Sequence, residues 1–334
     1  MTDDPAGYRR VTSFDVAKLA GVSRAAVSRA FTADASISQK TRAKVEEAAE
    51  RLGYRVNYLA RSLNGNRSDL VGVVAAAFDN PFRAMQIEAL SHELLKRNFR
   101  PILLPTTRAS DVSEVIEQVL NYAVSGVLVT SDAPSSSLCQ DCARQQVPIV
   151  LINKGDAIPF VDRVVSDDAE AGKIAFERLV GRGARRLVMI AGTEVSFSAR
   201  QRSEAFLRLA SERGIAASLI EVAVNNYSAG FSAAQKLADV DPDGLFCAND
   251  YLACGVLDRL KVDPALAALR GIPVIGHDNI PQASWDAYAL TTIAQPCDVQ
   301  AEQAIDLLTS RIAEPTLDTR TIVTPVRLHE RNSG

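Results

Sequence analysis

The sequence predicts an all-α helix-turn-helix head followed by an α/β core of two lobes built on parallel sheets. Short helical patterns fill the chain up to about residue 54, and beyond Ser68 apolar, strand-like runs alternate with amphipathic stretches. The charge is also uneven, because residues 1–67 hold 12 Lys and Arg against 7 Asp and Glu, whereas the remainder holds 25 against 33. A basic head on an acidic body is expected to attract an anionic polymer by one end.

The head is expected to contain three short helices. Thr12-Ser13-Phe14-Asp15 is typical of a capping box and begins the first helix. Gly21-Val22-Ser23 ends it, and Ser23 caps a second helix over residues 24–31. Ser38 caps the third. The side chains expected to face inward recur at helical spacing: Val16, Leu19, Ala20, Ala26, Val27, Ala30, Val45, Ala48, Ala49 and Leu52.

Two helices joined by a short glycine-containing turn form a helix-turn-helix unit, whose second helix can lie in the DNA major groove. Arginine on that helix suits guanine, because its guanidinium can donate to O6 and N7 together, while hydroxyl side chains suit phosphates. The pattern alone leaves open a plain helical hairpin. The head residues expected to contact DNA are Thr12, Ser23, Arg24, Ala25, Ser28, Arg29 and Thr41.

The head also resembles that of the LacI/GalR repressor family. The resemblance is carried by the segments Val11 to Ser23, Ala26-Val-Ser-Arg-Ala-Phe31, Ser38-Gln-Lys-Thr-Arg42 and Leu52-Gly-Tyr54, together with Asn57 to Leu63, and it continues along nearly the whole chain. It implies that the chain binds a double-stranded, pseudo-palindromic DNA operator as a homodimer.

The resemblance further implies that Asn57–Leu63 is a hinge helix that folds on DNA. Leu63 would then be inserted into the central base step of the minor groove, with Ala60 packed against its symmetry mate. Without the family match, Leu63 would be interpreted as an ordinary buried residue. The family usually has proline just before the hinge asparagine, and here Val56 occupies that position, so the hinge of this chain is expected to differ from its relatives at that point.

The core contains seven strand-like runs alternating with six helix-like segments, which is typical of parallel sheets covered by helices. Because one sheet of that length would be large, two lobes are expected. The strand-like runs are 70–75, 102–104, 126–130, 149–153, 187–191, 244–248 and 274–276. The helix-like segments are 82–97, 112–122, 169–182, 200–213, 228–237 and 250–260.

Ligands of such sheets bind beyond the carboxyl ends of the strands, and polar residues follow several strands here. Carboxylates, amides and arginines suit a polyhydroxy ligand, since each can make paired hydrogen bonds, and an aromatic ring can stack on the ligand's apolar face. The alternative is that these Asn and Asp residues only cap the next helix, which we favour for Asp250. The expected effector contacts are Phe82, Asn153, Arg202, Tyr227, Asn249 and Asp278.

Core motifs extend the family resemblance: Ser-Ala-Arg-Gln-Arg202, Ala-Asn-Asp250, Val-Ile-Gly-His-Asp278-Asn-Ile-Pro and Leu-Thr-Thr-Ile-Ala-Gln-Pro296. They imply a type I periplasmic-binding-protein-like fold. His277 stands where most members have an aromatic residue, and Ala294 where a polar or basic residue is common. The domains expected are 1–56 for the head, 57–68 for the hinge and linker, and 69–334 for the core, with one lobe of 69–166 and 295–318 and another of 167–294 and 319–334.

Other classes of protein fit the sequence poorly. It has no G-x-S-x-G, P-loop or H-E-x-x-H motif and only three His, so no enzyme and no cofactor is expected. Cys139 and Cys142 lack the second pair of ligands that zinc needs and are interpreted as ordinary thiols on a helix. No membrane segment or signal peptide is apparent, which argues against a secreted sugar-binding protein of the same fold and favours the cytoplasm.

The predicted function is therefore a transcriptional regulator, most simply a repressor, controlled by a small-molecule effector bound between the lobes. A sugar or sugar derivative is the first expectation, with a nucleobase-like ligand as the alternative. The sequence leaves open whether the effector releases the protein from DNA or promotes its binding. No leucine heptads follow Leu328, so a dimer without a tetramerising tail is expected.

Overall fold

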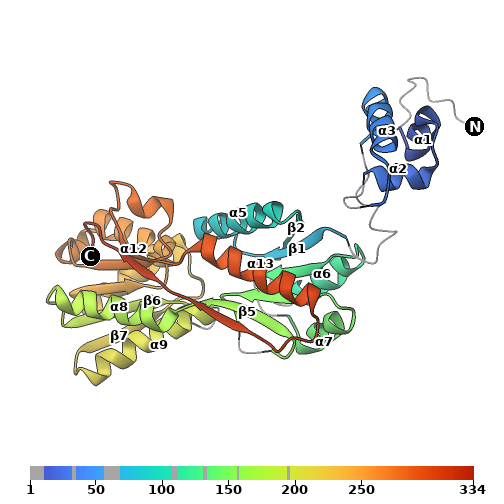
Figure 1. Ribbon diagram of the computed structural model, residues 1–334. Helices are drawn as coiled ribbons and strands as arrows, with labels where there is room; N and C mark the ends of the chain where they lie inside the picture. The colour runs from blue at the N-terminus through green and yellow to red at the C-terminus, as the bar shows by residue number, and fades with distance from the viewer. Residues whose placement is uncertain are drawn as a thin grey trace, which may run out of the picture. The chain divides into compact units, whose positions relative to one another are not determined.

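The computed structural model describes residues 11–31, 35–55, 68–106, 111–130, 134–155, 158–193 and 196–334 (Figure 1). The chain divides into two compact units, Met1–Ser68 and Asp69–Gly334, which we describe separately as the head and the core. The second unit begins at the residue where the sequence analysis started the core. Within the described residues, no helix combines the length and apolar character needed to cross a membrane.

The head is a three-helix unit of α1 (Ser13–Ala20), α2 (Arg24–Ala30) and α3 (Gln39–Leu52). Gly21 ends α1 in the left-handed conformation, at φ 65°. One prediction was wrong: Leu19 is 43% exposed, and Ala17 is buried instead. The inward arc of α1 runs from Val16 through Ala20 to Ala17, so that Leu19 lies beyond its edge. The buried residues are Val16, Ala17, Val27, Ala30, Val45, Ala48 and Ala49.

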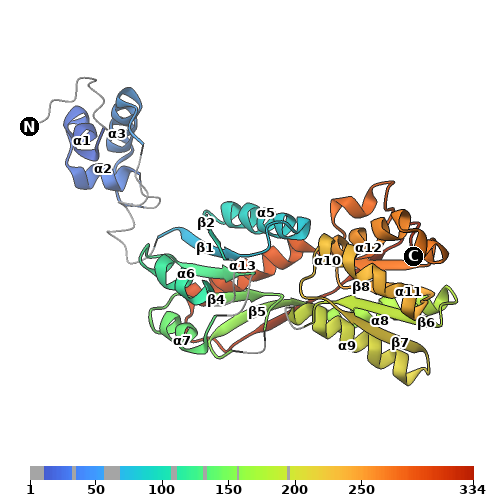
Figure 2. The same ribbon diagram turned by 180° about the vertical axis from the view of Figure 1, so that it is seen from behind.

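The core contains two six-stranded sheets, one in each lobe. The first lobe has the strand order β11-β5-β4-β3-β1-β2, all parallel. Its strands are β1 (Leu70–Ala75), β2 (Arg100–Pro105), β3 (Gly126–Val129), β4 (Ile149–Ile152), β5 (Val161–Ser166) and β11 (Thr321–Thr324). Helices α5 (Pro81–Lys96) and α13 (Cys297–Ala313) cover one face, and α6 (Asp111–Leu120) and α7 (Ser136–Arg144) cover the other (Figure 2).

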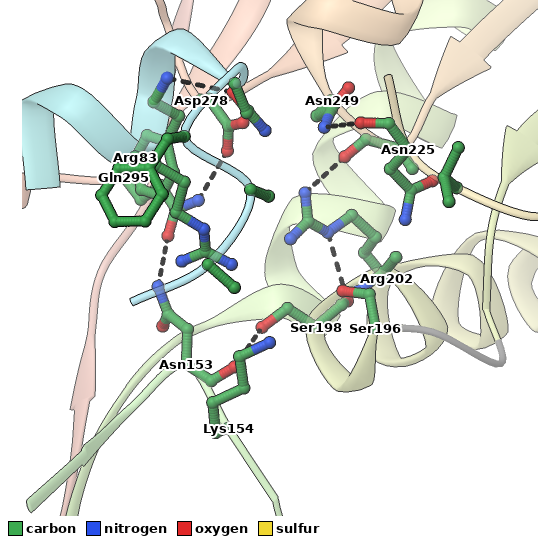
Figure 3. Close-up of a pocket in the computed structure, with 18 of the residues that line it drawn as sticks. Arg83, Asn153, Lys154, Ser196, Ser198, Arg202, Asn225, Asn249, Asp278 and Gln295 are labelled. Atoms are coloured by element: carbon green, nitrogen blue, oxygen red, sulfur yellow. Dashed lines mark hydrogen bonds between the residues drawn. The ribbon is translucent and has the colours of Figure 1, made fainter. Parts of the chain in front are cut away.

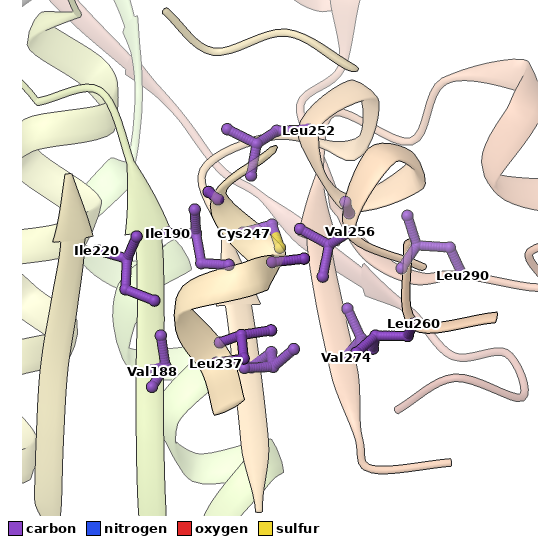
Figure 4. Close-up of a cluster of buried hydrophobic side chains, with 14 of the residues drawn as sticks. Val188, Ile190, Ile220, Leu237, Cys247, Leu252, Val256, Leu260, Val274 and Leu290 are labelled. Atoms are coloured by element: carbon purple, nitrogen blue, oxygen red, sulfur yellow. The ribbon is translucent and has the colours of Figure 1, made fainter. Parts of the chain in front are cut away.

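The second lobe has the order β12-β10-β9-β8-β6-β7, in which only β12 is antiparallel to its neighbour among the described strands. Its strands are β6 (Arg186–Ala191), β7 (Ala216–Glu221), β8 (Gly244–Cys247), β9 (Val274–His277), β10 (Thr291–Ala294) and β12 (Arg327–His329). One face is covered by α8 (Asp168–Gly181) and α9 (Phe197–Glu212). The other is covered by α10 (Tyr227–Ala233), α11 (Leu237–Val240) and α12 (Asp250–Val262), over the apolar cluster of Figure 4.

The chain passes between the lobes after β5, after β10 and after β11. Residues 319–334 are expected in the second lobe from the sequence, and the strand pairing corrects this boundary. Thr321–Thr324 pairs with β5 in the first sheet, and only β12 joins the second. The chain therefore reaches the second lobe between residues 324 and 327, because the short, half-exposed β11 completes the edge of the first sheet.

Two helix pairs in the second lobe approach closely through glycines. A Cβ added to Gly172 of α8 would lie 2.3 Å from the carbonyl oxygen of Arg202 on α9. A Cβ on Gly255 of α12 would lie 2.1 Å from the carbonyl oxygen of Tyr227 at the start of α10. Since no larger residue fits without moving a backbone, these glycines fix the positions of helices that carry or flank the predicted effector residues.

Candidate functional site

The exposed face of α2 carries the residues predicted to read DNA. Arg24, Ala25, Ser28 and Arg29 are exposed, whereas Val27 and Ala30 are buried on the opposite side. The Arg29 side chain lies along the helix, with Nε donating to the carbonyl oxygen of Ala25 at 3.4 Å. Two arginines on one solvent-facing helix surface can meet phosphates or base edges.

The other predicted head residues lie at helix starts. Ser23 caps α2 by accepting from the backbone N–H of Ala26 at 3.2 Å, and Ser38 caps α3 by accepting from Thr41 at 3.2 Å. The Thr12 hydroxyl donates to Asp15 at 2.7 Å. Thr12 and Ser23 are exposed and Thr41 is half-buried. Hydroxyls at helix N-termini sit beside the positive ends of the helix dipoles, where anions such as phosphates bind.

Arg42 connects two helices of the head, because its guanidinium on α3 donates to the carbonyl oxygen of Ala30 at the end of α2. This contact satisfies a carbonyl that the end of α2 leaves without an intrahelical donor. The predicted hinge residues Val56, Asn57, Ala60 and Leu63 lie outside the described residues, so their roles stay predictions.

A cavity of about 560 Å³ lies within the core and takes side chains from both lobes (Figure 3). Its position beyond the carboxyl ends of the parallel strands is where such sheets bind ligands, and its volume suits a small metabolite. Its lining comprises Ala76, Ala77, Phe78, Asn80, Phe82, Arg83, Thr106, Asn153, Lys154, Ser196, Ser198, Ala199, Arg202, Val224, Asn225, Ala248, Asn249, Asp278 and Gln295.

Five of the six predicted effector residues line this cavity: Phe82, Asn153, Arg202, Asn249 and Asp278. Tyr227 does not. Its hydroxyl donates to Asp258 at 2.9 Å and its ring lies against Phe231 and Tyr251. The prediction for Tyr227 was wrong because, as the first residue of α10, it packs into the interface with α12, where Gly255 contacts its backbone.

Arg202 is held firmly at the cavity wall. It is 4% exposed, its Nη2 lies 2.9 Å from a carboxylate oxygen of Asp168, and its Nη1 donates to the carbonyl oxygen of Ala248 at 2.6 Å. A third bond runs from Nε to the carbonyl oxygen of Ser198 at 3.2 Å. With three partners fixing its plane, the guanidinium is already oriented before any ligand arrives, which lowers the entropy lost on binding.

A chain of hydrogen bonds joins the lobes at the base of the cavity. Gln295 donates from Nε2 to Asp278 at 2.6 Å, and its Oε1 accepts from Asn153 at 2.7 Å and from Ser166 at 2.8 Å. Asp278 belongs to the second lobe, whereas Asn153 and Ser166 belong to the first. Gln295 lies in the crossover segment between β10 and α13, so one amide connects side chains of both lobes (Figure 3).

The loop that presents Asp278 is anchored by a buried carboxyl. Asp250 is fully buried and accepts from Ile280 N–H at 2.9 Å and from the Thr292 hydroxyl at 2.5 Å. Burial, together with the nearby Asp278 charge, raises the pKa of Asp250 well above its ordinary value. Asp250 therefore does more than begin α12, the role the sequence analysis favoured, because it fixes the loop after β9. The N-cap of α12 is Asn249.

Three cavity residues have left-handed backbones, Ala77 at φ 54°, Asn153 at φ 56° and Asp278 at φ 113°. For a residue other than glycine, such conformations cost free energy and persist where surrounding contacts impose them, often at binding sites. Next to Asp278, the fully buried His277 places Nδ1 at 3.0 Å from the Asp278 carboxylate. Burial, reinforced by the Arg202 charge, lowers the pKa of His277, which favours the neutral ring.

Sequence reasoning missed several polar residues of the cavity, chiefly Arg83, Lys154, Asn225 and Gln295. The signals were present: Lys154 directly follows the predicted site residue Asn153, and Arg83 lies in the first turn of α5 beside Phe82. Asn225 could not be found in the same way, because β7 was not predicted. Asn225 binds the backbone of Gly192 across the strand ends at 2.7 and 3.1 Å.

The chain is similar to known proteins in both units. The family model described as "Bacterial regulatory proteins, lacI family" matches residues 14–57, and one described as "Periplasmic binding protein-like domain" matches residues 176–334. The ribose operon repressor of Escherichia coli (strain K12) is 32% identical over 335 residues, covering 97% of this chain and 99% of that protein. Catabolite control protein A of Priestia megaterium is 27% identical, covering 97% and 99%.

Solved structures share the fold. A lac repressor bound to ONPG has a TM-score of 0.84 at 23% identity and covers 98% of this chain and all of its own. A LacI-family regulator from Enterococcus faecium with bound ribose has a TM-score of 0.70 at 25% identity, covering 79% of this chain and 98% of that one. The fold predicted from the sequence, with its two parallel-sheet lobes, is confirmed by this likeness and by the strand pairing.

Proposed function

The chain belongs to the LacI family of bacterial regulatory proteins and is a DNA-binding repressor under effector control, and we propose that its effector is a sugar or sugar derivative bound in the core cavity. The observation that carries the proposal is the cavity itself, where Asp278, Asn153, Asn249 and the oriented Arg202 converge from both lobes. Amides and carboxylates of this kind bind hydroxyl groups in pairs. Proteins similar to this chain include a ribose operon repressor and a regulator with bound ribose.

On the DNA side, α2 acts as the recognition helix and places Arg24 and Arg29 in the major groove. The hydroxyls of Ser23 and Thr41 contact phosphates. The chain works in the cytoplasm. It acts as a homodimer, because two heads related by a twofold axis read the two halves of a pseudo-palindrome. The hinge segment 57–63 couples the head to the core.

On the effector side, a ligand that binds Asp278 and Asn153 competes for the atoms that Gln295 now joins. Effector binding therefore changes the contact between the lobes. The spacing of the two hinges of a dimer changes with it. A ligand shifts such an equilibrium only by its difference in affinity for the two states. No catalytic step belongs to this function.

The proposal is tested in two steps. Fragmented bacterial DNA is incubated with the purified chain, and sequencing of the retained fragments should reveal one enriched pseudo-palindrome, whose binding weakens steeply as salt rises from about 50 mM to about 200 mM. Sugars and sugar derivatives are then screened for thermal stabilisation, because a ligand that binds only the folded state raises its stability. Hits should alter binding to the enriched site.

A head-deleted chain of residues 69–334 serves as the control, since this unit is compact by itself. It should respond to the same ligands and retain no DNA. Equal enrichment by the intact and the shortened chain would contradict the DNA-binding proposal, and a hit that leaves operator binding unchanged would contradict the role of the cavity.

A further inference from the structure

The side chains of His277 and Asp278 meet although the two residues are neighbours in the chain. His277 is the last residue of β9 and pairs with Ile293 of β10, and consecutive side chains of a strand point to opposite faces of the sheet. Asp278 departs from this rule, since its backbone is left-handed at φ 113° and its Oδ1 lies 3.0 Å from Nδ1 of His277. The turn at Asp278 therefore brings a buried imidazole and a buried carboxylate together.

The His277 ring is hydrogen-bonded through Nδ1. The ring is fully buried, and its Nε2 has no hydrogen-bond partner among the residues that the structure describes. A neutral imidazole carries one proton, on either nitrogen, whereas an ionised carboxylate only accepts hydrogen bonds. The contact with Asp278 is therefore a hydrogen bond when the proton is on Nδ1. A proton on Nε2 would leave a buried donor unsatisfied and place two acceptors face to face.

The charged groups around the ring favour its neutral form. His277 lies two residues after Ile275 and so on the same face of the sheet, which α8 and α9 cover. Burial and the Arg202 charge of α9 lower the pKa of His277, and they outweigh Asp278 and Asp168, which act in the opposite direction. At neutral pH the ring therefore donates a hydrogen bond to Asp278 without adding a positive charge beside it.

Two donors hold the same oxygen of the Asp278 carboxylate. Oδ1 contacts Nδ1 of His277 at 3.0 Å and accepts from Nε2 of Gln295 at 2.6 Å, and no hydrogen bond from the described residues ends on Oδ2. Asp278 lines the cavity, and Figure 3 shows its carboxylate at the edge of the hollow, next to Gln295. Because Oδ1 is fixed by two partners, Oδ2 is the oxygen available to accept from a ligand hydroxyl.

We propose that His277 is a positioning residue for effector recognition, whose Nδ1–H holds Oδ1 of Asp278 so that Oδ2 stays oriented toward an effector hydroxyl. The inference rests on the proposed function and deepens it. Gln295 is the partner for which the effector competes, so His277 is the donor that remains on Asp278 when the cavity fills. A carboxylate oriented before binding loses less entropy when the effector arrives.

The first experiment locates the proton and needs no ligand. The full-length chain is labelled with ¹⁵N-histidine, and NMR spectra that correlate ring nitrogens with ring protons are recorded at pH about 7.5, above the ordinary histidine pKa of about 6.5. The chain has three His, of which His92 and His329 are exposed and serve as references. The signals that disappear in His277→Phe belong to His277. They should show a proton on Nδ1, and a proton on Nε2 would overturn the proposal.

The second experiment measures the effect on binding, with D-ribose as the probe, in calorimetric titrations of the full-length chain without DNA. His277→Phe keeps a ring of similar size and removes the donor, so it should weaken D-ribose ~10-fold or more. His277→Asn places an amide donor where Nδ1 stands, so it should bind D-ribose within ~3-fold of the unaltered chain. His329→Asn, an exposed histidine of the same lobe, is the control and should change nothing.

Thermal melts separate the hydrogen bond from packing. Asparagine is smaller than histidine and leaves a void at a fully buried position, so His277→Asn should melt at a lower temperature than His277→Phe. Affinity and stability should therefore rank the two variants in opposite orders. If D-ribose affinity instead follows stability, with His277→Asn the weaker binder, His277 acts through packing and the proposal is overturned.

The two proposals fail in different ways. If His277→Phe binds D-ribose as tightly as the unaltered chain, the inference about His277 is overturned and the sugar-controlled repressor stands. If D-ribose does not bind, the variants are compared with the tightest-binding sugar of the thermal screen. If no sugar binds the unaltered chain, the proposed sugar control fails, and the position of the His277 proton decides the inference by itself.

Discussion

Individual side chains divide into two groups that act at different places. The exposed polar residues of α2 lie in the head, and the polar residues of the cavity lie in the core, in a separate compact unit. Because distant sites usually contribute independently, a substitution in one group should leave the direct binding property of the other unchanged. One substitution in each of the two groups tests this separation.

Arg29→Ala should reduce operator affinity at least ~10-fold, because a well-placed arginine contributes ~1–3 kcal/mol of base discrimination, while effector binding stays unchanged. The control is Arg51→Ala, which removes an exposed arginine of α3 from the same head. Fluorescence anisotropy with labelled operator measures the first property and calorimetry the second. An unchanged anisotropy titration for Arg29→Ala would rule this residue out as a reader of DNA.

Asp278→Ala should bind operator normally and lose its response to effector. The substitution removes the carboxylate that accepts from Gln295 and faces the cavity, and losing a charged hydrogen-bond partner should weaken the effector ~10-fold to ~100-fold. Asp286→Ala, an exposed aspartate of the same lobe, is the control. A normal response of operator binding to effector in Asp278→Ala would exclude Asp278 as a ligand.

At the scale of elements, close helix pairs and strand edges determine where the site residues stand. Arg202 occupies the buried side of α9, and that helix approaches α8 so closely that Gly172 leaves no room for a methyl group. In the other lobe, β5, α13 and the residue before β11 meet at the buried Asp162. One substitution at Gly172 tests the contact between α8 and α9, and one at Asp162 tests the contacts in the other lobe.

Gly172→Ala should destabilise the core by ~1–3 kcal/mol, because the added Cβ would lie 2.3 Å from the Arg202 carbonyl and 3.0 Å from Ala205 Cβ. The displaced α9 should also weaken effector binding. Gly181→Ala in the same helix is the matched control, since its Cβ would meet nothing within 4 Å, and alanine favours helix by up to ~1 kcal/mol. Urea unfolding compares the two. Equal stability of both variants would contradict the tight contact.

Asp162→Asn should make the core less sensitive to acid. Burial would raise the pKa of Asp162, but hydrogen bonds from Arg311 at 2.7 and 2.8 Å and from Arg320 at 2.8 and 3.1 Å outweigh burial and hold this pKa below its ordinary value. A carboxylate whose pKa is lower in the folded than in the unfolded chain stabilises the fold at pH values above its ordinary pKa. This stabilisation is lost as the pH falls through the pKa of the folded state.

The amide variant should therefore lose ~3–5 kcal/mol near neutral pH, as expected for breaking a buried ion pair. The difference in unfolding free energy from the unaltered chain should stay constant near neutral pH and shrink as the pH is lowered from about 5 to about 2. Asp141→Asn, at an exposed ion pair, should show neither effect. A difference that is constant with pH would contradict the assignment to Asp162.

At the scale of the whole molecule, the regulator couples two sites in separate units. Gln295 lies at a crossover between lobes and joins Asp278 to Asn153, so it is placed to change partners when the cavity fills. Coupling between two ligands is reciprocal: if effector changes operator affinity by some factor, operator must change effector affinity by the same factor.

Effector affinity should therefore differ with and without saturating operator, by the factor that effector imposes on operator affinity. For typical coupling of ~1–3 kcal/mol this factor is ~5-fold to ~150-fold. Calorimetric titration of effector, with a scrambled DNA duplex as the control, measures it. Identical effector affinity in the presence of operator and of scrambled DNA would refute coupling between the two units.

Local patterns in the sequence predict much of the fold and part of the cavity. Capping residues and helical spacing placed all three head helices, and the alternation of apolar runs placed seven strands of the core, because local hydrogen bonding and burial leave a regular trace. Strand-end position and family resemblance together found five lining residues of the cavity: Phe82, Asn153, Arg202, Asn249 and Asp278.

Tertiary structure alone decided the rest. The edge strands β7, β11 and β12 carry half-exposed side chains and so lack an apolar pattern, and β11 joins the first sheet through pairing that spans about half the chain. Tyr227 does not line the cavity, because helix packing directs its hydroxyl to Asp258. Arg83, Lys154 and Gln295 line one cavity although they lie in α5, after β4 and after β10, and contacts between elements so far apart in the sequence leave no local signal in the chain.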